Sequence, residues 1–431
     1  MKYIFSYTLL LLLSCSALYA QETPQDSLAT YKKRVLETTE VDFLMSYYTQ
    51  DGTHAAVTGG KGTEELTDIT PTFVVAIPLN DDDVLTIDAG ISAYTSASSS
   101  NIDPFDGDKP ADPFVASSGA SQSDVWANMN INYSHSSDDR NDVWAAHVNV
   151  ASEYDYFSVG FGGSYTKLFN EKNTEIGVKA NIFLDTWNPQ YPIEFRDGFS
   201  RPDIVGTGAY ANSFEKFANE GRNTYSLSLS FSQILSKNAQ ASIFLDLVKQ
   251  DGLLSTPHQR VYFSDVADFF VQNFQLGDDV ERLPNTRFKV PIGGRFNYYI
   301  NESISLRTYY RYYFDDWGIN SHTASIEVPI KFAEGKFTLY PTYRYYTQTA
   351  ADYFAPFEAH VSTSEFYTSD YDLSKFDSHQ YGAGFKYYDV FAKLKIFKFG
   401  LKTVDLRYNY YSRSDGLSAN IISAGFKFVM D

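Results

Sequence analysis

The sequence predicts an all-β protein, a transmembrane antiparallel up-and-down β-barrel of about sixteen strands within a range of about 14–18. Apolar and polar residues alternate with a period of two along segments of roughly ten residues, the length of a tilted strand that crosses a bilayer. The breaks between these segments are alternately short and long. The 431 residues are 17% aromatic. Beyond the N-terminus they contain no uncharged apolar run of about 18 residues, which excludes membrane-spanning helices.

The first twenty residues, MKYIFSYTLLLLLSCSALYA, have the parts of a secretory signal peptide. Lys2 supplies the positive end, Ile4 to Leu13 the apolar core, and Ala20 the small residue before a cleavage point. A lipobox ending at Cys15 is the alternative, and it would make that cysteine a lipid-modified N-terminus. Cleavage after Ala20 would remove the single cysteine and with it any thiol chemistry. We expect a signal peptide at 1–20, a periplasmic segment at 21–36 and an outer-membrane β-barrel at 37–431.

Each expected strand has one apolar and one polar face. In residues 223–232 the even positions are small and polar, whereas the odd positions from Tyr225 to Phe231 are apolar. Alternation resumes after a break at 236–238, which predicts a hairpin with one apolar face. The expected strand centres are residues 43, 73, 89, 129, 147, 162, 180, 229, 244, 293, 309, 327, 342, 384, 406 and 425.

The breaks between strands fall into two classes. Tight polar turns lie at 80–83, 170–173, 301–303 and 333–336, and long loops lie near 97–122, 186–222, 251–285 and 350–378. Outer-membrane barrels have short periplasmic turns and long extracellular loops, so this sorting favours a barrel over a soluble sandwich. Residues 389–400, DVFAKLKIFKFG, are too long for a tight turn, and the sequence leaves an extra helix or a bent strand open there.

Two related segments, YRYYFDDW and YRYYTQTA, set an arginine among tyrosines near strand ends. Period-two geometry turns the arginines toward a wet interior and the alternate tyrosines toward lipid, where an aromatic girdle forms at the interface. The predicted girdle is Tyr310, Tyr312, Tyr343 and Tyr345. The predicted lumen lining is Arg295, Arg307, Arg311, Arg344 and Arg407, facing Asp88 and Asp246. A soluble aromatic core is the alternative, which the signal peptide and the number of strands disfavour.

The C-terminal strand resembles the signal that the bacterial barrel-assembly machinery reads. The resemblance rests on Ser423, Gly425, Phe428 and Met430, with Asp431 in place of the usual terminal aromatic residue. We therefore expect that machinery and the lipid bilayer as partners.

Charge and short motifs narrow the function further. The formal net charge of −18 excludes a nucleic-acid-binding surface, which needs a basic face. Four carboxylates, Asp103, Asp106, Asp108 and Asp112, have a spacing that calcium can use, but no bidentate glutamate closes a twelve-residue loop. A solvated loop is favoured, so no cofactor is expected, with calcium in the loop as the alternative. TGGKGT at 58–63 lacks the full phosphate-loop motif and is predicted to be a flexible hairpin tip.

Five stretches in this order resemble the family of outer-membrane barrels known as domain of unknown function thirty-five-seventy. They are SEYDYFSVGFG (152–162), QDGLLSTPHQRVYF (250–263), YRYYFDDWGINSHTASIE (310–327), YRYYTQTAADYF (343–354) and SDYDLSKFDS (369–378). The family's SGASP-like segment stands here as SGASQ at 118–122, without the proline. The resemblance implies an outer-membrane barrel of no established activity. It also implies gene neighbours of flavin-transferase and thioredoxin-like type.

Three classes of function remain open. The leading prediction is a porin-like channel or small-solute transporter with a charged lumen. The alternative is a surface scaffold or a partner in envelope flavin or thiol redox assembly. The second alternative is a barrel lipid hydrolase, which needs a serine beside a histidine. His258 and His322 lie in the family-like stretches and are its first candidates. No catalytic residue is assigned, and an enzyme is not expected.

Overall fold

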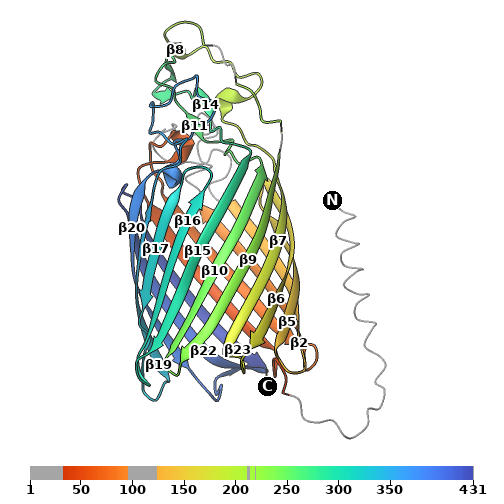
Figure 1. Ribbon diagram of the computed structural model, residues 1–431. Helices are drawn as coiled ribbons and strands as arrows, with labels where there is room; N and C mark the ends of the chain where they lie inside the picture. Colours follow the sequence, from red (N-terminus) through yellow and green to blue (C-terminus); the bar gives the residue numbers. More distant parts are fainter. Residues whose placement is uncertain (1–32, 96–123, 211–213, 219, 431) are drawn as a thin grey trace. The chain divides into compact units, whose positions relative to one another are not determined.

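A computed structural model describes residues 33–95, 124–210, 214–218 and 220–430. Within these residues, sixteen long antiparallel strands form a single closed barrel (Figure 1). Neighbours along the chain pair with each other, and pairing of the first strand with the last closes the cylinder. The predicted fold class is confirmed. The same part of the chain contains no helix long and apolar enough to cross a membrane.

The barrel strands have the following bounds: β1 (Glu40–Asp51), β2 (Leu66–Pro78), β3 (Asp83–Thr95), β4 (Asp124–Ser136), β5 (Asp142–Ser152), β6 (Tyr156–Phe169), β7 (Thr174–Trp187), β9 (Gly221–Ser236), β10 (Ala239–Gly252), β15 (Thr286–Tyr299), β16 (Ser305–Asp315), β17 (Asn320–Glu327), β19 (Phe337–Gln348), β20 (Phe376–Tyr388), β22 (Phe399–Arg413) and β23 (Ser418–Met430). Each predicted strand centre falls inside one of them. The length and alternation of the segments were therefore sufficient to locate the strands.

Two short strands extend this sheet at one rim. β18 (Ile330–Phe332) pairs with the start of β19, and β21 (Lys395–Ile396) pairs with the start of β22. The segment at 389–400 is thus a turn followed by a small hairpin. It is neither the extra helix nor the bent strand that the sequence left open.

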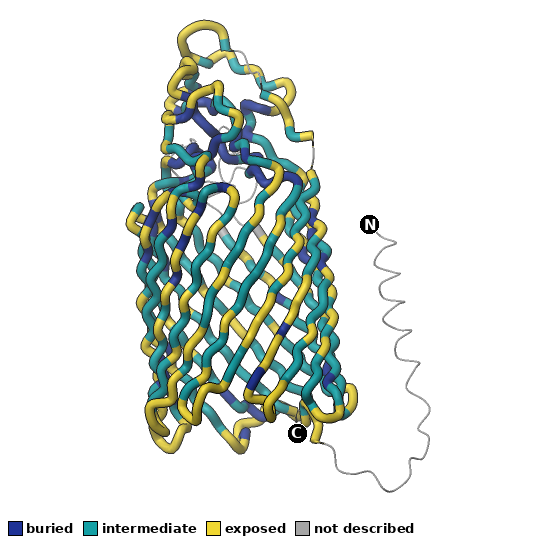
Figure 2. Tube along the Cα trace, viewed as in Figure 1, coloured by how far each residue is buried: buried dark blue, intermediate teal, exposed yellow. Residues whose placement is uncertain are grey.

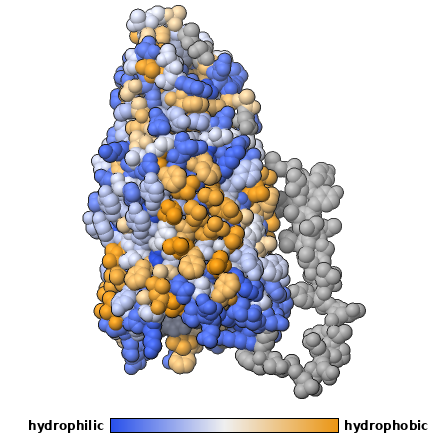
Figure 3. Space-filling model, viewed as in Figure 1, coloured by the Kyte–Doolittle hydropathy of each residue, from blue (hydrophilic) through white to orange (hydrophobic). Residues whose placement is uncertain are grey.

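The period of two sorts the side chains by face. Phe43 on β1 lies opposite Phe73 on β2 and Phe426 on β23, with ring centroids 4.8 and 6.1 Å apart. On the same outer surface Ile243 is 61% exposed and Ile91 is 53% exposed. Such exposure of large apolar groups is favourable where the surrounding medium is hydrocarbon. Figure 3 shows apolar residues gathered around the middle of the barrel, with polar residues toward its lower end and on the part above it.

The two rims differ. The rim that holds the breaks at 79–82, 170–173 and 333–336 is called the turn rim, and the opposite one is called the loop rim. Four loops of the loop rim fold together into a cap over the barrel end (Figure 1). The cap consists of the described residues within 52–65, 188–220, 253–285 and 349–375. Buried positions concentrate in it, as Figure 2 shows.

Short elements build the cap. They are η2 (Ala56–Thr58), η3 (Ile193–Phe195), β8 (Ile204–Gly206), β11 (Arg260–Val261), β12 (Phe269–Val271), β13 (Phe274–Gln275), β14 (Asp279–Val280) and η4 (Tyr371–Leu373). β8, β12 and β13 form a three-stranded sheet, and β11 pairs with β14. Val271 and Phe274 of that sheet form a buried apolar cluster with Leu276, and Leu254, Leu283 and Trp317 form another where the cap meets the barrel. The cap therefore has an apolar core of its own.

The prediction of a flexible tip at 58–63 is wrong. Val57 and Thr58 are buried in the cap, at 1% and 5% exposed. Gly59 has a φ of 72°, and a Cβ there would lie 2.6 Å from the Tyr262 ring. The segment needs glycine because it turns in a left-handed conformation against a neighbouring loop. Its lysine, Lys61, lies over the Phe357 ring with the ammonium 3.7 Å from the centroid.

Several expectations fall outside the described residues. They concern the signal peptide at 1–20, Cys15, the carboxylates Asp103, Asp106, Asp108 and Asp112, the segment at 118–122, and Asp431.

Candidate functional site in the barrel lumen

Basic residues gather on one side of the barrel interior. The five predicted arginines lie on β15, β16, β19 and β22, on the face opposite the outward tyrosines. Strand register brings some of them into one row, since Arg295 pairs with Tyr309, Tyr309 with Ser325, and Ser325 with Arg344. We call this set, Arg295, Arg307, Arg311, Arg344 and Arg407, the basic wall.

Two members of the basic wall are neutralised by acids. Arg307 and Arg407 donate to opposite oxygens of Glu327, at 2.8 and 3.1 Å, and Arg407 also donates to Asp405 at 3.0 Å. Arg407 reaches Glu327 across two intervening strands. Gly384 leaves room for it, because a Cβ there would lie 3.0 Å from the Arg407 Cγ. These two arginines therefore form a fixed network along the wall.

The other three arginines have no acid partner in the described part of the chain. Arg295 lies over the Tyr309 ring and Arg344 over the Tyr346 ring, with guanidinium-to-centroid distances of 5.7 and 6.0 Å. The Nε of Arg311 is buried and has no hydrogen-bond partner among the described residues. Stacking on aromatic faces positions a guanidinium without neutralising its charge. These three arginines, Arg295, Arg311 and Arg344, are called the upper basic wall, and they are therefore positively charged.

The two predicted aspartates lie on the lumen face without meeting the arginines. Asp88 on β3 has Val74 and Asn130 as its cross-strand neighbours, and Asp246 on β10 faces Ser228 on β9. Neither forms an ion pair with the basic wall among the described residues. The acids that neutralise the arginines are Glu327 and Asp405, which the sequence reasoning missed. Strand parity alone places both of these acids on the inner face, so they could have been found.

The side of the lumen formed by β4 to β9 is polar and mostly uncharged. Most of its residues are amides and hydroxyls, among them Asn128 and Asn130 on β4 and the serine ladder of β9, and Lys179 on β7 also lies on this face. Asn181 donates to the Ser226 hydroxyl at 2.9 Å. The side-chain oxygens of Asn128, Asn130 and Asn181 are buried without a hydrogen-bond partner in the part of the chain that the structure describes. Buried polar atoms of this kind require a hydrogen-bonding partner, which a water-filled or solute-filled interior supplies.

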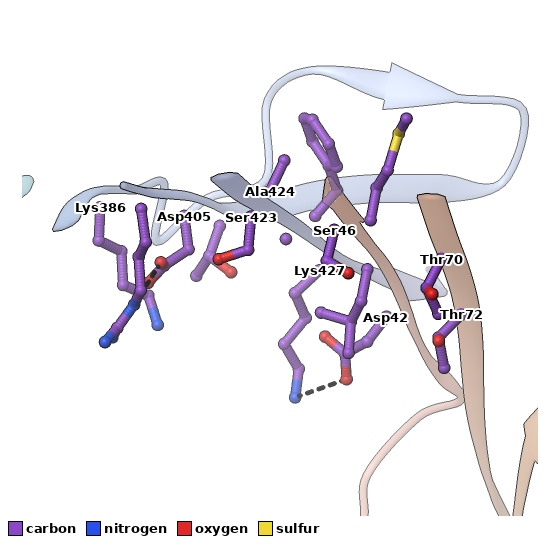
Figure 4. A pocket seen from close by; sticks show the side chains of 15 residues that line it. Asp42, Ser46, Thr70, Thr72, Lys386, Asp405, Ser423, Ala424 and Lys427 are labelled. Atoms are coloured by element: carbon purple, nitrogen blue, oxygen red, sulfur yellow. Dashed lines mark hydrogen bonds and ion pairs between the residues drawn. The ribbon is translucent and has the colours of Figure 1, made fainter. Parts of the chain in front are cut away.

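A cavity of about 550 Å³ opens in the interior toward the turn rim. Asp42, Thr70, Thr72, Lys386 and Ser423 are among the residues that line it (Figure 4). Lys427 forms ion pairs with Glu40 at 2.5 Å and with Asp42 at 3.7 Å, the second of which Figure 4 marks. The predicted assembly residues Ser423 and Gly425 belong to this lining, whereas Phe428 and Met430 continue the opposite, outer face of β23.

The predicted girdle tyrosines have their hydroxyls bonded near strand ends at the loop rim. Tyr310 bonds to His322 at 2.7 Å and Tyr343 to His379 at 2.9 Å. The remaining two bonds run from Tyr312 to Asn320 and from Tyr345 to Asp377. His322 is therefore a partner of outward-facing tyrosines rather than a neighbour of a nucleophile.

The other candidate histidine lies elsewhere. His258 belongs to the cap and contacts the Trp187 ring edge-on, with centroids 6.3 Å apart. Burial, aided by the charge of Arg260, lowers the pKa of His258 to about 4. The structure thus does not bring His258 and His322 together. The described residues also contain no group of three or more histidine, cysteine or acidic side chains that could hold a metal ion.

One ion pair sits inside the cap. Arg260 and Glu194 are both fully buried, and the guanidinium donates to both carboxylate oxygens at 2.6 and 3.0 Å. Glu194 also accepts from the Gly277 backbone N–H at 3.1 Å, and Arg260 donates to the Val57 carbonyl at 3.4 Å. The pair joins three of the four loops. The sequence gives no local signal for it, since its partners are far apart along the chain.

Two more carboxyls are buried in the cap. Glu281 accepts from the Thr256 N–H and from the Thr368 hydroxyl, and burial raises its pKa to about 8. Asp370 accepts from Gln259 and from the Asp372 N–H, and burial, together with the charge of Asp372, raises its pKa to about 6. The cap therefore contains acids whose charge changes near neutral pH.

Comparison with known proteins gives a family and a set of similar folds. A family model described as "Protein of unknown function (DUF3570)" matches residues 8–424. No curated protein matches. Among solved structures, a bacterial polysaccharide outer membrane secretin is 11% identical, with 91% of this chain and 98% of that chain covered and a TM-score of 0.44. A BenF-like porin from Pseudomonas fluorescens Pf-5 is 10% identical, with 91% and 98% covered and a TM-score of 0.40. The outer membrane protein OpdK from Pseudomonas aeruginosa is 8% identical, with 91% and 99% covered and a TM-score of 0.39.

Proposed function

The chain belongs to the DUF3570 family, and from that premise we propose that it is an outer-membrane channel that favours small anionic solutes. The proposal includes export of the chain, directed by a signal peptide at residues 1–20. The single observation that carries it is the upper basic wall, three lumen-facing arginines without an acid partner in the described part of the chain. A closed barrel of this strand number has an interior wide enough for water and a small solute.

The two sides of the lumen have complementary roles in this proposal. The guanidinium groups attract a carboxylate or phosphate and bind it in a bidentate manner. The neutral amides and hydroxyls opposite them hydrogen-bond the rest of the solute. Because the positive charges lie on one wall instead of in a closed ring, the solute can move from one arginine to the next. Conduction requires such binding to be weak and repeated.

The cap supports a gated rather than an open channel. Its apolar clusters and buried ion pair hold four loops over the loop rim. The same observation favours the scaffold as second candidate, in which the cap binds an envelope partner and conduction is incidental. The two candidates differ in whether ions cross the barrel.

Planar-bilayer recording tests the proposal. In a salt gradient the wild-type protein is expected to give discrete conductance steps and a reversal potential on the anion-selective side. Replacing Arg311→Gln and Arg344→Gln together removes two of the unpaired charges and should move the reversal potential toward zero. Arg201→Gln is the matched control, because Arg201 lies in the cap and is paired with Asp203 at 2.9 Å. It should leave the selectivity unchanged.

Two outcomes contradict the channel. A refolded protein that stays silent at all voltages favours the scaffold. A double variant with unaltered selectivity would show that the basic wall does not act on permeating ions.

A further inference from the structure

A second cavity, of about 470 Å³, lies where the cap meets the upper ends of β1 and β22. Its polar lining includes Tyr48 and Gln50 from β1, Glu64 and His54 from the β1–β2 loop, and Gln259 and Asp370 from two other loops. Its size is within the range of sites for small organic molecules. It is separate from the cavity at the turn rim and shares no lining residue with it.

Three donor side chains of this lining each donate one hydrogen bond within the protein. The Tyr48 hydroxyl donates to Gln50 Oε1 at 2.6 Å, and the Gln50 amide donates to the Glu64 carbonyl at 2.8 Å. The Gln259 amide donates to Asp370 at 3.3 Å. These donors are therefore partly engaged within the protein before a ligand enters the cavity.

One acceptor is unsatisfied in the described structure. Gln259 is 8% exposed, and its Oε1 has no hydrogen-bond partner among the described residues. Its orientation follows from chemistry, because a reversed amide would point oxygen at the Asp370 carboxylate. The neutral ring of His54 offers a second acceptor: its Nδ1 lies 3.1 Å from the Gly60 carbonyl, so in that form Nδ1 is the donor and Nε2 has the lone pair. The His54 ring is held flat against Tyr371 with centroids 3.8 Å apart.

The charge of the lining is negative. Arg413 is the one arginine or lysine among the lining residues, and it is committed to Asp372 and to Asp415, each at 2.5 Å. Glu64 and Asp370 form no ion pair among the described residues. Burial raises the pKa of Glu64 and that of Asp370, because the charge of Arg413, which forms its ion pairs with Asp372 and Asp415, only partly offsets the loss of water around these two carboxylates. A bare metal ion does not suit the site, since the described residues do not bring three acidic or histidine ligands together.

We propose that this cavity, the subcap site, binds a small organic cation that carries N–H donors, such as a primary ammonium or guanidinium group. The cation donates to Gln259 Oε1 and to the carboxylates of Asp370 and Glu64. The site is opposite in charge to the basic wall and does not depend on conduction. Its ligand is therefore a different molecule, or a different end of the same molecule, from the anion that the basic wall attracts.

Calorimetric titration of the full-length protein in detergent tests the subcap site with three probes of equal length. These are 1,4-diaminobutane, neutral 1,4-butanediol and the dianion succinate. The diamine is expected to bind, with the diol at least about tenfold weaker. Asp370→Asn and Gln259→Leu should each weaken diamine binding about tenfold. Asp265→Asn, a cap-surface change at a carboxylate that bonds Ser362, should leave it within about twofold.

Limited proteolysis shows whether Asp370→Asn loosens the cap, since equal cleavage rates for the variant and the wild-type protein exclude loosening. If the cap is loosened, Glu64→Gln serves as a second variant on an independent loop. The proposal is overturned if the diamine gives no saturable binding, or if its affinity is the same in all three site variants. It is also overturned if the diol binds as tightly as the diamine. Succinate binding that depends on Arg344 but not on Asp370 would support two separate sites.

Discussion

At the scale of single residues, the cap contains acids whose ionisation opposes its folding. Glu281 has two hydrogen-bond donors, from Thr256 and Thr368, but no cation within reach among the described residues. Removing a carboxylate from water without a counter-charge disfavours the ionised form. Hydrogen bonds to the ionised form only partly offset that cost, so the pKa of Glu281 stays raised, at about 8.

We predict that the cap becomes less stable as the pH rises from 6.5 to 8. The pKa of Glu281 is about 8 in the folded cap against an ordinary value of 4.5, so this contribution to stability is fully present below 4.5 and lost as pH rises through 8. The equilibrium constant for opening of the cap should increase by up to about tenfold per pH unit between pH 6.5 and 8. The low pKa of His258 makes the cap more stable as the pH rises, which is the opposite effect, but this effect is confined to pH values below 6.5. The rate of protease cleavage in the cap measures the opening.

Glu281→Gln is the matched variant for this pH dependence. It keeps the shape of the side chain and removes its charge, so the cleavage rate should become nearly independent of pH between 6.5 and 8. Persistence of the full pH dependence in that variant would assign it to a group other than Glu281.

At the scale of elements, the loops are organised by a few long-range contacts. Arg260 on β11 joins Glu194 in η3 and Val57 in η2. The cap is also fastened to the barrel, since Gln348 at the end of β19 donates to the Asp372 and Ser374 carbonyls at 2.9 and 2.6 Å. Loops held in this way behave as a folded layer with its own core.

We predict that Glu194→Ala loosens the cap by about 3–5 kcal/mol, because it leaves the buried Arg260 charge without a partner. Faster hydrogen exchange and faster proteolysis of the cap loops are the readouts. The double change Glu194→Leu with Arg260→Met removes both charges and should recover most of the protection. The control is Asp197→Ala, which breaks an exposed pair with Lys216 in the same layer and should cost under about 1 kcal/mol. Equal effects of the buried and exposed changes would mean that the pair does not hold the cap.

At the scale of the whole molecule, stability comes from closure. β1 and β23 pair along nearly their full length, so the barrel sheet has no free edge. The outer surface carries large apolar side chains such as Phe73, at 52% exposed, and Tyr381, at 54%. A molecule with this surface requires lipid or detergent around it.

We predict that the purified protein stays in solution only with detergent and migrates differently on a gel before and after boiling. The unboiled barrel remains closed because all of its strands are hydrogen-bonded to two neighbours, and heat is needed to open it. Electrophoresis of heated and unheated samples checks this expectation. Identical mobility of the two samples, or solubility without detergent, would contradict a closed membrane barrel.

The sequence by itself determined the strands and their two faces. Alternation is a local property with a period of two, so Ile243 and Ser242 can be assigned to opposite faces without knowing what surrounds them. The same parity placed the five arginines on one face and the four predicted girdle tyrosines on the other. Parity also assigns Glu327 and Asp405 to the inner face, but it does not show that they pair with the arginines. Which strands are neighbours around the lumen depends on register and closure.

The contacts that build the cap could be known only from the tertiary structure. Its defining contacts join residues 66, 87 and 203 positions apart, in the pairs Arg260 with Glu194, Thr368 with Glu281, and Arg260 with Val57. Irregular loops carry no period, so their sequence does not reveal which loop packs on which. The buried charges of the cap and the acceptor-rich cavity beneath it exist because four loops meet in space. The physical reason is that burial and pKa depend on neighbours from distant segments, whereas strand formation depends mainly on local alternation in a lipid solvent.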